Sequence, residues 1–412
     1  MADGMEELDR AWRDEWGRLL ALLVAGFRRL DLAEDGLADA FEAAARTWPR
    51  DGTPTNPAGW LMTTARRRIL DRLRSEAVAV RTMPRLAVES ELTEEAQRVM
   101  ADTGDGLADE RLRLLLLCAH PSLPAEAAAA LTLRLVLGVS TPDIARLFLV
   151  STPTMAARLT RARKRLASES FAMPTGADLV ERVSAVADIA YLAFTAGYAP
   201  GSGADVLRAA EAGEAIRLVR VVRGLLPAGF DAADDIDALL ALMLLQHARR
   251  DARVAEGALV LLPHQDRALW HAGEIDEALE LLRPQLGRPS TPYLLQALIA
   301  AEHAVPGSAE QTDWSRIARW YAELEDLVPS PVVRLNRAVA VAEADGPLAG
   351  LRLLDGLELP GHRLPGARAE LLARSGDVAA ALASYDEAIA RCDNEPERAH
   401  LVRRRTEAEG RG

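Results

Sequence analysis

The chain has 412 residues, longer than one compact core usually spans, so its length predicts two or three domains. Hydrophobic residues make up 49% and aromatic residues 4% of a chain dominated by alanine, leucine and arginine, which favours helices over an extensive β-sheet. Two cysteines, an acidic start without an apolar signal segment, and the lack of an apolar run of about 20 residues argue against secreted, disulfide-rich and membrane-embedded proteins. We therefore expect an all-α cytoplasmic protein without a membrane partner.

The charge of the chain is unevenly distributed. The net charge is −12, but residues 1–175 carry 24 basic and 25 acidic side chains, whereas the remainder carries 25 and 36. Two basic segments lie in the nearly neutral part: five arginines with one aspartate in residues 66–74, and five basic residues without an acid in residues 158–165. Such local stripes can bind nucleic acid even in an acidic chain.

The first predicted elements are three helices. Apolar residues recur at helical spacing from Leu8 through Trp12 to Phe27. A second helix is predicted over residues 32–48, with Asp31 as its N-cap. The segment 49–59, rich in proline and glycine, predicts a loop from which Asn56 caps the third helix.

The helical pattern weakens over residues 76–106, which predict a linker with a short helix at 91–100. Helices are predicted again over residues 107–118 and 125–137. Two shorter helices follow at 141–148 and 152–166, joined by a tight turn. The N-cap of the first is Ser140 or Thr141, and that of the second is Ser151 or Thr152.

The remainder of the chain has the texture of a helical repeat. One spacing of small and large residues occurs twice, in Gly273, Ala278 and Leu282 and again in Gly376, Ala381 and Tyr385. The two glycines lie 103 residues apart, about three periods of the roughly 34-residue tetratricopeptide repeat. Small residues in such a repeat let paired helices approach closely.

The helices at 141–148 and 152–166 have the pattern of a helix-turn-helix, in which Ala145 permits close approach. The second helix exposes a polar first turn, suited to the major groove, and then basic residues, suited to phosphates. Its candidate DNA-binding residues are Thr152, Thr154, Arg158, Arg161 and Arg165. The alternative is an ordinary helical hairpin with a solvated basic face, and the basic run without an acid favours DNA.

The helix after Asn56 carries Trp60 and an arginine cluster that includes Arg66, Arg67, Arg68 and Arg72. Guanidinium groups beside an aromatic residue and a polar loop suit a DNA strand whose bases have left the duplex. The alternative is a surface helix, and for Trp60 alone a place in the core is favoured. The acids of residues 31–39 would by themselves be a solvated helix face.

Together, and in this order, these segments resemble the bacterial extracytoplasmic-function sigma factors, in the group that carries a C-terminal tetratricopeptide-like extension. DLAEDGLADAFEAA resembles the polymerase-binding helix of region 2, and NPAGWLMTTARRRILDRLRSE its promoter-melting helix. Residues 131–166 resemble the region 4 helix-turn-helix. The resemblance covers nearly the whole chain, with residues 76–106 least informative, and departs at Gly36, where a larger residue is usual.

The resemblance implies a role for each segment. The clamp helices of the largest subunit of core RNA polymerase would be contacted by Asp31, Glu34, Asp35, Asp39 and Phe41. The −10 promoter element would be engaged by Asn56, Trp60, Arg66, Arg67, Arg68, Asp71 and Arg72. The −35 element would be read or flanked by Thr152, Thr154, Arg158 and Arg161.

The expected domains are region 2 over residues 1–75, a linker over 76–106, region 4 over 107–172 and a tetratricopeptide-like extension over 178–412. The expected function is that of an alternative sigma factor, which directs promoter-specific transcription initiation on core RNA polymerase and promoter DNA. The acidic extension would regulate it in cis and bind a protein or peptide in its groove. The alternative is a helix-turn-helix regulator with a repeat scaffold and no affinity for core polymerase, and the additional arginine-rich helix favours the sigma factor.

Motifs for catalysis or metal binding do not stand out in the sequence. The seven histidines are scattered and form no helical pair of metal ligands. Cys118 and His120 are more typical of a core and a helix end than of a zinc site. Residues 201–203 predict a surface turn, and the acids of 234–237 a solvated loop. We therefore expect no enzyme activity, no cofactor and no metal.

Overall fold

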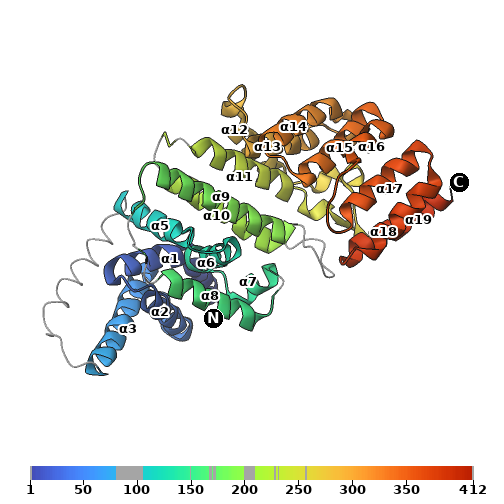
Figure 1. The fold of residues 1–412 in the computed structure, drawn as a ribbon. Helices are drawn as coiled ribbons and strands as arrows, with labels where there is room; N and C mark the ends of the chain where they lie inside the picture. The colour runs from blue at the N-terminus through green and yellow to red at the C-terminus, as the bar shows by residue number, and fades with distance from the viewer. Residues whose placement is uncertain are drawn as a thin grey trace. The chain divides into compact units, whose positions relative to one another are not determined.

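The computed structural model describes residues 2–79, 105–148, 150–166, 169, 173–198, 209–226, 229–230, 232–255 and 258–410. Throughout these ranges α-helices dominate, which confirms the predicted all-α fold (Figure 1). The strands found in these ranges, β1 (Val254–Ala255) and β2 (Ala258–Leu259), form one antiparallel pair. No helix in the described ranges has the length and apolar character that a membrane span requires.

The chain divides into two compact units. The first comprises Met1–Ala193 and Arg217–Ala232, and the second comprises Phe194–Ile216 and Ala233–Gly412. The domain boundaries expected at residues 75, 107, 172 and 178 stay predictions. Most of the expected linker, with its short helix at 91–100, lies outside the described residues, as does the turn expected at 201–203.

Three long helices begin the first unit: α1 (Ala2–Phe27), α2 (Leu30–Asp51) and α3 (Pro57–Ala79). α2 packs along both α1 and α3. A Cβ atom at Gly36 of α2 would lie 2.5 Å from Cγ1 of Ile69 and 3.1 Å from the carbonyl oxygen of Ala65 on α3. Close approach of the two helices therefore requires glycine where the sigma-factor pattern has a larger residue.

Local capping explains where several helices begin. Asn56 Oδ1 accepts a hydrogen bond from the backbone N of Gly59 at 2.9 Å, as predicted for the start of α3. Of the open alternatives for the next two caps, Ser140 and Ser151 are the residues whose hydroxyl groups accept from the backbone of the following helix.

The prediction that Asp31 caps α2 is wrong. Asp31 lies inside the first turn of α2, and the N-cap position is Arg29, which makes no side-chain cap bond. Nε and Nη2 of Arg29 instead donate to the two carboxylate oxygens of Asp31 at 2.9 and 2.7 Å. This bidentate pair lowers the pKa of the Asp31 carboxyl below its usual range.

Four helices follow in the first unit: α5 (Asp105–Cys118), α6 (Ala125–Leu137), α7 (Thr141–Leu147) and α8 (Thr152–Leu166). The bounds of α6 and α8 are those predicted. α9 (Ala177–Tyr198) and α10 (Ala209–Leu225) come next. Each donates a side-chain hydrogen bond to α5 or α6. Arg182 of α9 donates to the carbonyl oxygen of Leu116 at 3.0 Å, and Arg217 of α10 donates to that of Leu137 at 2.8 Å.

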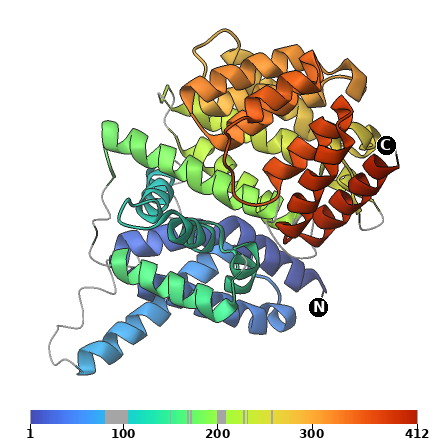
Figure 2. The same ribbon diagram turned by 45° about the vertical axis from the view of Figure 1, so that its right-hand side comes forward.

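The second unit is built from helices that pack against their neighbours in the chain. Its α-helices are α11 (Ala233–His247), α12 (Ala272–Leu282), α13 (Pro292–Ala304), α14 (Trp314–Leu327), α15 (Pro331–Asp345), α16 (Pro347–Leu354), α17 (Arg363–Ser375), α18 (Val378–Ala390) and α19 (Glu395–Glu409). Short 3-10 turns occur at Arg250–Ala252, Leu262–His264, Arg267–Leu269, Arg283–Gln285 and Ala309–Gln311. α17, α18 and α19, drawn in red, lie side by side in both ribbon views (Figures 1 and 2).

The small residues of this unit allow its helices to pair. A Cβ atom at Gly350 of α16 would lie 2.5 Å from the carbonyl oxygen of Ala338 on α15. The two glycines of the predicted repeat, however, occupy different positions. Gly376 ends α17 with a φ of 93°, whereas Gly273 lies inside the first turn of α12. The repeated spacing therefore places equivalent buried residues but not equivalent turns.

Candidate nucleic-acid interface

The helix pair α7–α8 presents the surface that was predicted to read DNA. Ile144 and Ala145 of α7 are buried, as are Met155 and Leu159 of α8. The packing of these side chains holds the opposite face of α8 in solvent. On that face Thr152, Thr154, Arg161 and Arg165 are exposed. The hydroxyl group of Thr154 lies 2.8 Å from that of Ser151, which fixes the first turn of the helix.

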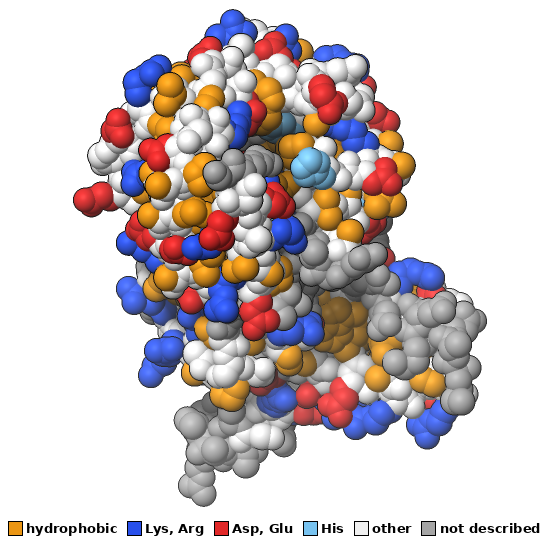
Figure 3. Space-filling model, turned by 90° about the vertical axis from the view of Figure 1, so that its right-hand side faces the viewer, with side chains coloured by type: hydrophobic (Ala, Val, Ile, Leu, Met, Phe, Trp, Pro, Cys, Tyr) orange, Lys and Arg blue, Asp and Glu red, His pale blue; other side chains and the backbone are white. Residues whose placement is uncertain are grey.

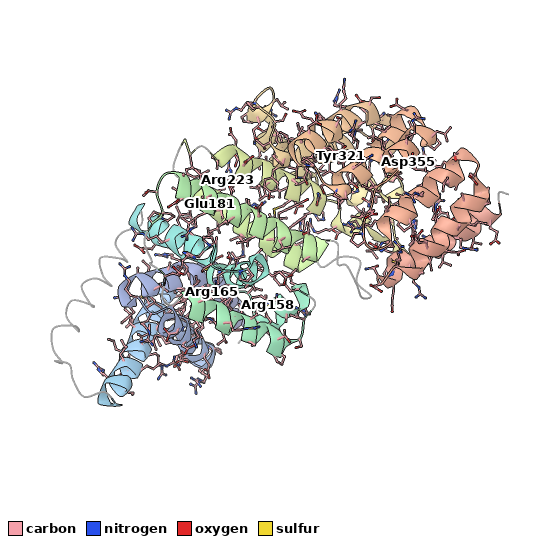
Figure 4. The ribbon with its side chains drawn as sticks, viewed as in Figure 1. Arg158, Arg165, Glu181, Arg223, Tyr321 and Asp355 are labelled. Carbon is pink, nitrogen blue, oxygen red and sulfur yellow. The ribbon has the colours of Figure 1, made fainter. Side chains whose placement is uncertain are left out.

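Arg158, which Figure 4 labels, also lies on α8 but is only partly exposed, because an acid from another helix pairs with it. Nη1 of Arg158 donates to Oε2 of Glu126 on α6 at 2.8 Å. The basic segment 158–165 contains no acid in the sequence, but the folded chain brings Glu126 of another helix into contact with it. Glu126 is mostly exposed, so the pair is open to water and to a competing phosphate.

We expect the Arg158→Ala substitution to weaken binding to a −35 duplex and to reduce the slope of log affinity against log salt by about one. The reason is that a phosphate contact by Arg158 releases about one counterion when it forms. Fluorescence anisotropy of a labelled duplex over a salt series measures both quantities. Arg46→Ala is the control, because Arg46 is an exposed arginine of α2 that pairs with Glu42 on the same helix. An unchanged slope in the Arg158 variant would contradict the phosphate contact.

The arginine-rich helix α3 exposes only part of its cluster. Arg67 and Arg68 are exposed, whereas Arg66 is buried. Asp71 is exposed and pairs with Arg74 at 3.2 Å. Asn56 is exposed, with its carbonyl oxygen committed to the cap of α3.

Trp60 of α3 is half-buried. Its burial is intermediate between the core position that was favoured for it and a fully exposed aromatic side chain. Its ring meets that of Trp48 edge to face, with 5.7 Å between the centroids. Part of the Trp60 side chain therefore remains exposed to solvent.

The guanidinium of Arg72 on α3 pairs with acids of α2, so in this arrangement it is not free to bind DNA. Its guanidinium lies 2.8 Å from Asp35 and 2.9 Å from Asp39. Two of the acids predicted to bind polymerase therefore hold one of the arginines predicted to bind the −10 element. All three side chains keep substantial exposure, so these pairs are weak surface contacts.

Glu34 differs most from its expected environment, because its helix face was expected to be solvated but the side chain is buried. It is 5% exposed, and its carboxylate accepts from Nε of Arg134 on α6 at 2.9 Å and from Arg163 on α8 at 2.8 Å. A buried carboxylate between two arginines is stable only while both partners stay in place. Glu34 therefore ties α2 to the helices that carry the helix-turn-helix.

Aromatic residues of α1 complete the same contact. Trp12 Nε1 donates to the carbonyl oxygen of Gly138 at 2.9 Å, and the Arg134 guanidinium lies 5.2 Å from the centroid of Trp16. Phe41 is buried against both tryptophans, with centroids 4.7 and 5.8 Å away. We call this set the closed contact: Glu34 with Arg134 and Arg163, Trp12 with Gly138, and Trp16 with Arg134. Of its residues, Glu34 was predicted to bind polymerase, and Arg163 belongs to the basic segment 158–165 that was predicted to bind nucleic acid.

Three family models match the chain. Residues 15–78 match sigma-70 region 2, residues 113–166 match sigma-70 region 4, and residues 182–286 match a family of unknown function (DUF6596). An uncharacterized protein of Rhizobium meliloti (strain 1021) is 41% identical over 394 residues, which cover 93% of this chain and 91% of that protein. No solved structure matches the chain.

These matches coincide with the surfaces described above. The region 2 match contains all of α2 and most of α3, and the region 4 match contains α7 and α8. Sigma factors with these regions bind core RNA polymerase and promoter DNA, and they initiate transcription rather than catalyse a reaction. The chain therefore belongs to the RNA polymerase sigma factors with sigma-70 regions 2 and 4, and it carries an additional C-terminal domain after them.

Proposed function

We propose that this sigma factor is of the extracytoplasmic-function type, that it acts in the cytoplasm, and that its C-terminal domain regulates it in cis. α3 would engage the −10 element through Asn56, Trp60, Arg66, Arg67, Arg68, Asp71 and Arg72. α8 would engage the −35 element through Thr152, Thr154, Arg158, Arg161 and Arg165. α2 would bind core polymerase through Asp31, Glu34, Asp35, Asp39 and Phe41.

The observation that carries the promoter assignment is the exposed first turn of α8. Thr152 and Thr154 lie at the solvent-facing start of a helix whose basic residues follow on the same exposed face. A helix with this order of side chains can place its N-terminal turn in the major groove while the arginines hold the phosphates. The exposed Arg67 and Arg68 of α3 supply the second DNA surface.

The closed contact cannot persist while both promoter elements are bound. Elements at −10 and −35 are about 25 base pairs apart, on the order of 85 Å of B-form DNA. Arg72 of α3 and Arg163 of α8 bind the neighbouring residues Asp35 and Glu34 of α2, which holds the two DNA surfaces much closer together. We infer that the closed contact opens when the protein joins polymerase and promoter. Opening would also expose Glu34 and Phe41 for polymerase.

The proposal for the C-terminal domain is a tetratricopeptide-like scaffold with a protein or peptide partner. A cavity of about 650 Å³ supports it, lined by Trp314, Tyr321 and Asn336 among others; Figure 4 labels Tyr321 on α14. On the face drawn in Figure 3, acidic and basic side chains are interspersed instead of gathered into one patch.

We expect the full chain to confer accurate initiation on purified core polymerase, and a chain ending at residue 232 to initiate at a different level. Run-off transcription from promoters of the source genome measures both. Truncation at 232 is preferable to truncation near 175, because it keeps Arg182 and Arg217, which bond to α5 and α6. A full chain that never directs accurate initiation would contradict the sigma-factor function. Equal activity of the two chains, with the shorter one shown to be folded, would remove only the cis-regulation.

A further inference from the structure

Three side chains of metal-ligating type meet in the second unit, and none of them is among the residues proposed to bind DNA. The imidazole of His362, the thiol of Cys392 and the carboxylate of Glu397 each place a ligand atom within 4.8 Å of the other two. His362 precedes α17, Cys392 follows α18, and Glu397 lies in the first turn of α19. The three helices lie side by side (Figure 2). Their packing brings together the segments at their ends, which carry the three ligands.

The local structure holds all three side chains in position. Nε2 of His362 lies 2.7 Å from Oε2 of Glu397. Asn394 caps α19 by accepting from the backbone N of Glu397 at 3.0 Å, and the thiol of Cys392 donates to the Asn394 carbonyl oxygen at 3.4 Å. Cys392 is buried in the cluster that contains Leu401, whereas His362 and Glu397 are half-buried. The thiol of Cys392 is therefore held in place and shielded from solvent, whereas His362 and Glu397 are accessible from solvent.

A cavity adjoins the two reachable ligands. It has a volume of about 740 Å³, and His362, Glu397 and His400 are among the residues that line it. Cys392 is not part of the lining. An ion bound by the three ligands would therefore meet protein on the side of the sulfur and open space on the side of the cavity.

We propose that His362, Cys392 and Glu397 bind a zinc ion whose fourth coordination position opens into this cavity. Zinc accepts nitrogen, sulfur and carboxylate ligands at about 2.0–2.3 Å in tetrahedral geometry, which requires ligand atoms roughly 3.2–3.8 Å apart. The observed ligand atoms, 2.7 Å apart for His362 and Glu397 and all within 4.8 Å of one another, lie within about 1 Å of that spacing. A mixed set of sulfur, nitrogen and oxygen disfavours magnesium and calcium, which prefer oxygen ligands only.

Binding of the ion exchanges existing bonds for metal bonds. The thiol of Cys392 loses its proton and its hydrogen bond to Asn394, and the hydrogen bond between His362 and Glu397 is replaced by coordination of both groups. The ion would then cross-link the segments around α17, α18 and α19. Its open position would hold water or a small ligand that enters the cavity.

The test uses the purified full chain and cobalt(II), which occupies zinc sites and is coloured. We expect one cobalt per chain, with a sulfur-to-cobalt charge-transfer band and the intense visible bands of a four-coordinate ion, all lost when zinc is added. Absence of the charge-transfer band in the unmodified chain would overturn the proposal.

Variants identify the ligands. Cys392→Ser should remove the charge-transfer band, whereas Cys118→Ser, which alters the other buried free cysteine, should keep it. Glu397→Gln should weaken zinc binding at least tenfold in competition with a chelating dye, and it remains informative if Cys392→Ser fails to fold. His400→Ala is the matched control, because His400 lines the same cavity but is outside the ligand set. A band that survives Cys392→Ser, or zinc affinity that depends on His400 and not on Glu397, would contradict this site.

Discussion

The Arg134→Gln substitution is expected to open the closed contact and to strengthen binding to core RNA polymerase about tenfold. Arg134 donates to Glu34 at 2.9 Å and packs on Trp16, and Arg134 itself is not among the residues proposed to bind DNA or polymerase. Loss of a hydrogen bond to a charged group costs about 1.5–3 kcal/mol, which destabilises the closed state relative to the open state by a similar amount. Apparent affinity rises with the fraction of open molecules, and about 1.4 kcal/mol corresponds to a factor of ten.

The affinity is measured by titrating labelled full-length protein with core polymerase, and opening is measured independently by faster hydrogen exchange in α1 and α6. Arg113→Gln is the control, because Arg113 of α5 is also partly buried but pairs with Glu110 three residues away on the same helix. Faster exchange with no gain in polymerase affinity would show that the closed contact does not limit binding.

Glu34→Gln separates the two roles assigned to Glu34. If the carboxylate acts only in the closed contact, this variant should bind polymerase more tightly, as Arg134→Gln does. If it also contacts the clamp helices after opening, the gain should be smaller or reversed. The comparison of the two variants therefore tests the polymerase assignment of Glu34 in the open state.

Local signals in the sequence were sufficient to predict most helices and their caps. Asn56, Ser140 and Ser151 begin their helices because a short polar side chain can accept from the backbone two or three residues ahead, which depends on neighbours only. The bounds of α6 and α8 follow in the same way from apolar periodicity and from flanking proline or glycine. The outward face of α8 could likewise be predicted, because the buried Met155 and Leu159 orient it.

Contacts between distant segments could not be predicted. Glu34 lies 100 residues from Arg134 and 129 residues from Arg163, so nothing near it in the sequence distinguishes it from the exposed Asp31 and Asp35. Its helical face was expected to be solvated, but two other helices cover it. The neighbouring acids Asp35 and Asp39 likewise meet Arg72 only because α2 packs on α3.

The proposed zinc ligands show the same limit. His362 and Cys392 are far apart in the sequence and belong to no helical pair, so spacing alone gave no reason to associate them. The turns before α17 and after α18 bring them together. A motif search finds ligands that are near in sequence, whereas this set depends on how three helices pack.

The Gly17→Ala substitution is expected to separate α1 from α6 and to lower the free energy of unfolding by about 1–3 kcal/mol or more, the cost typical of overpacking. A Cβ atom at Gly17 would lie well within 3.0 Å of the carbonyl oxygen of Val136, and that oxygen belongs to the helix backbone, which cannot turn aside. Relief requires movement of α1, which also breaks the hydrogen bond from Trp12 to Gly138. Denaturant unfolding followed by circular dichroism measures the loss.

Gly26→Ala on the same helix is the matched control, because a Cβ atom there would meet nothing within 4 Å. Alanine stabilises a helix relative to glycine by about 0.5–1 kcal/mol, so this variant should be neutral or more stable. The two substitutions add the same methyl group to α1, and only the one that faces α6 should be harmful. Since Gly17 and Trp12 hold α1 against α6 while Glu34 holds α2 against α6 and α8, Gly17→Ala should also bind core polymerase more tightly than Gly26→Ala. Equal stability of the two variants would mean that α1 and α6 do not approach this closely, and the closed contact would then rest on Glu34 alone.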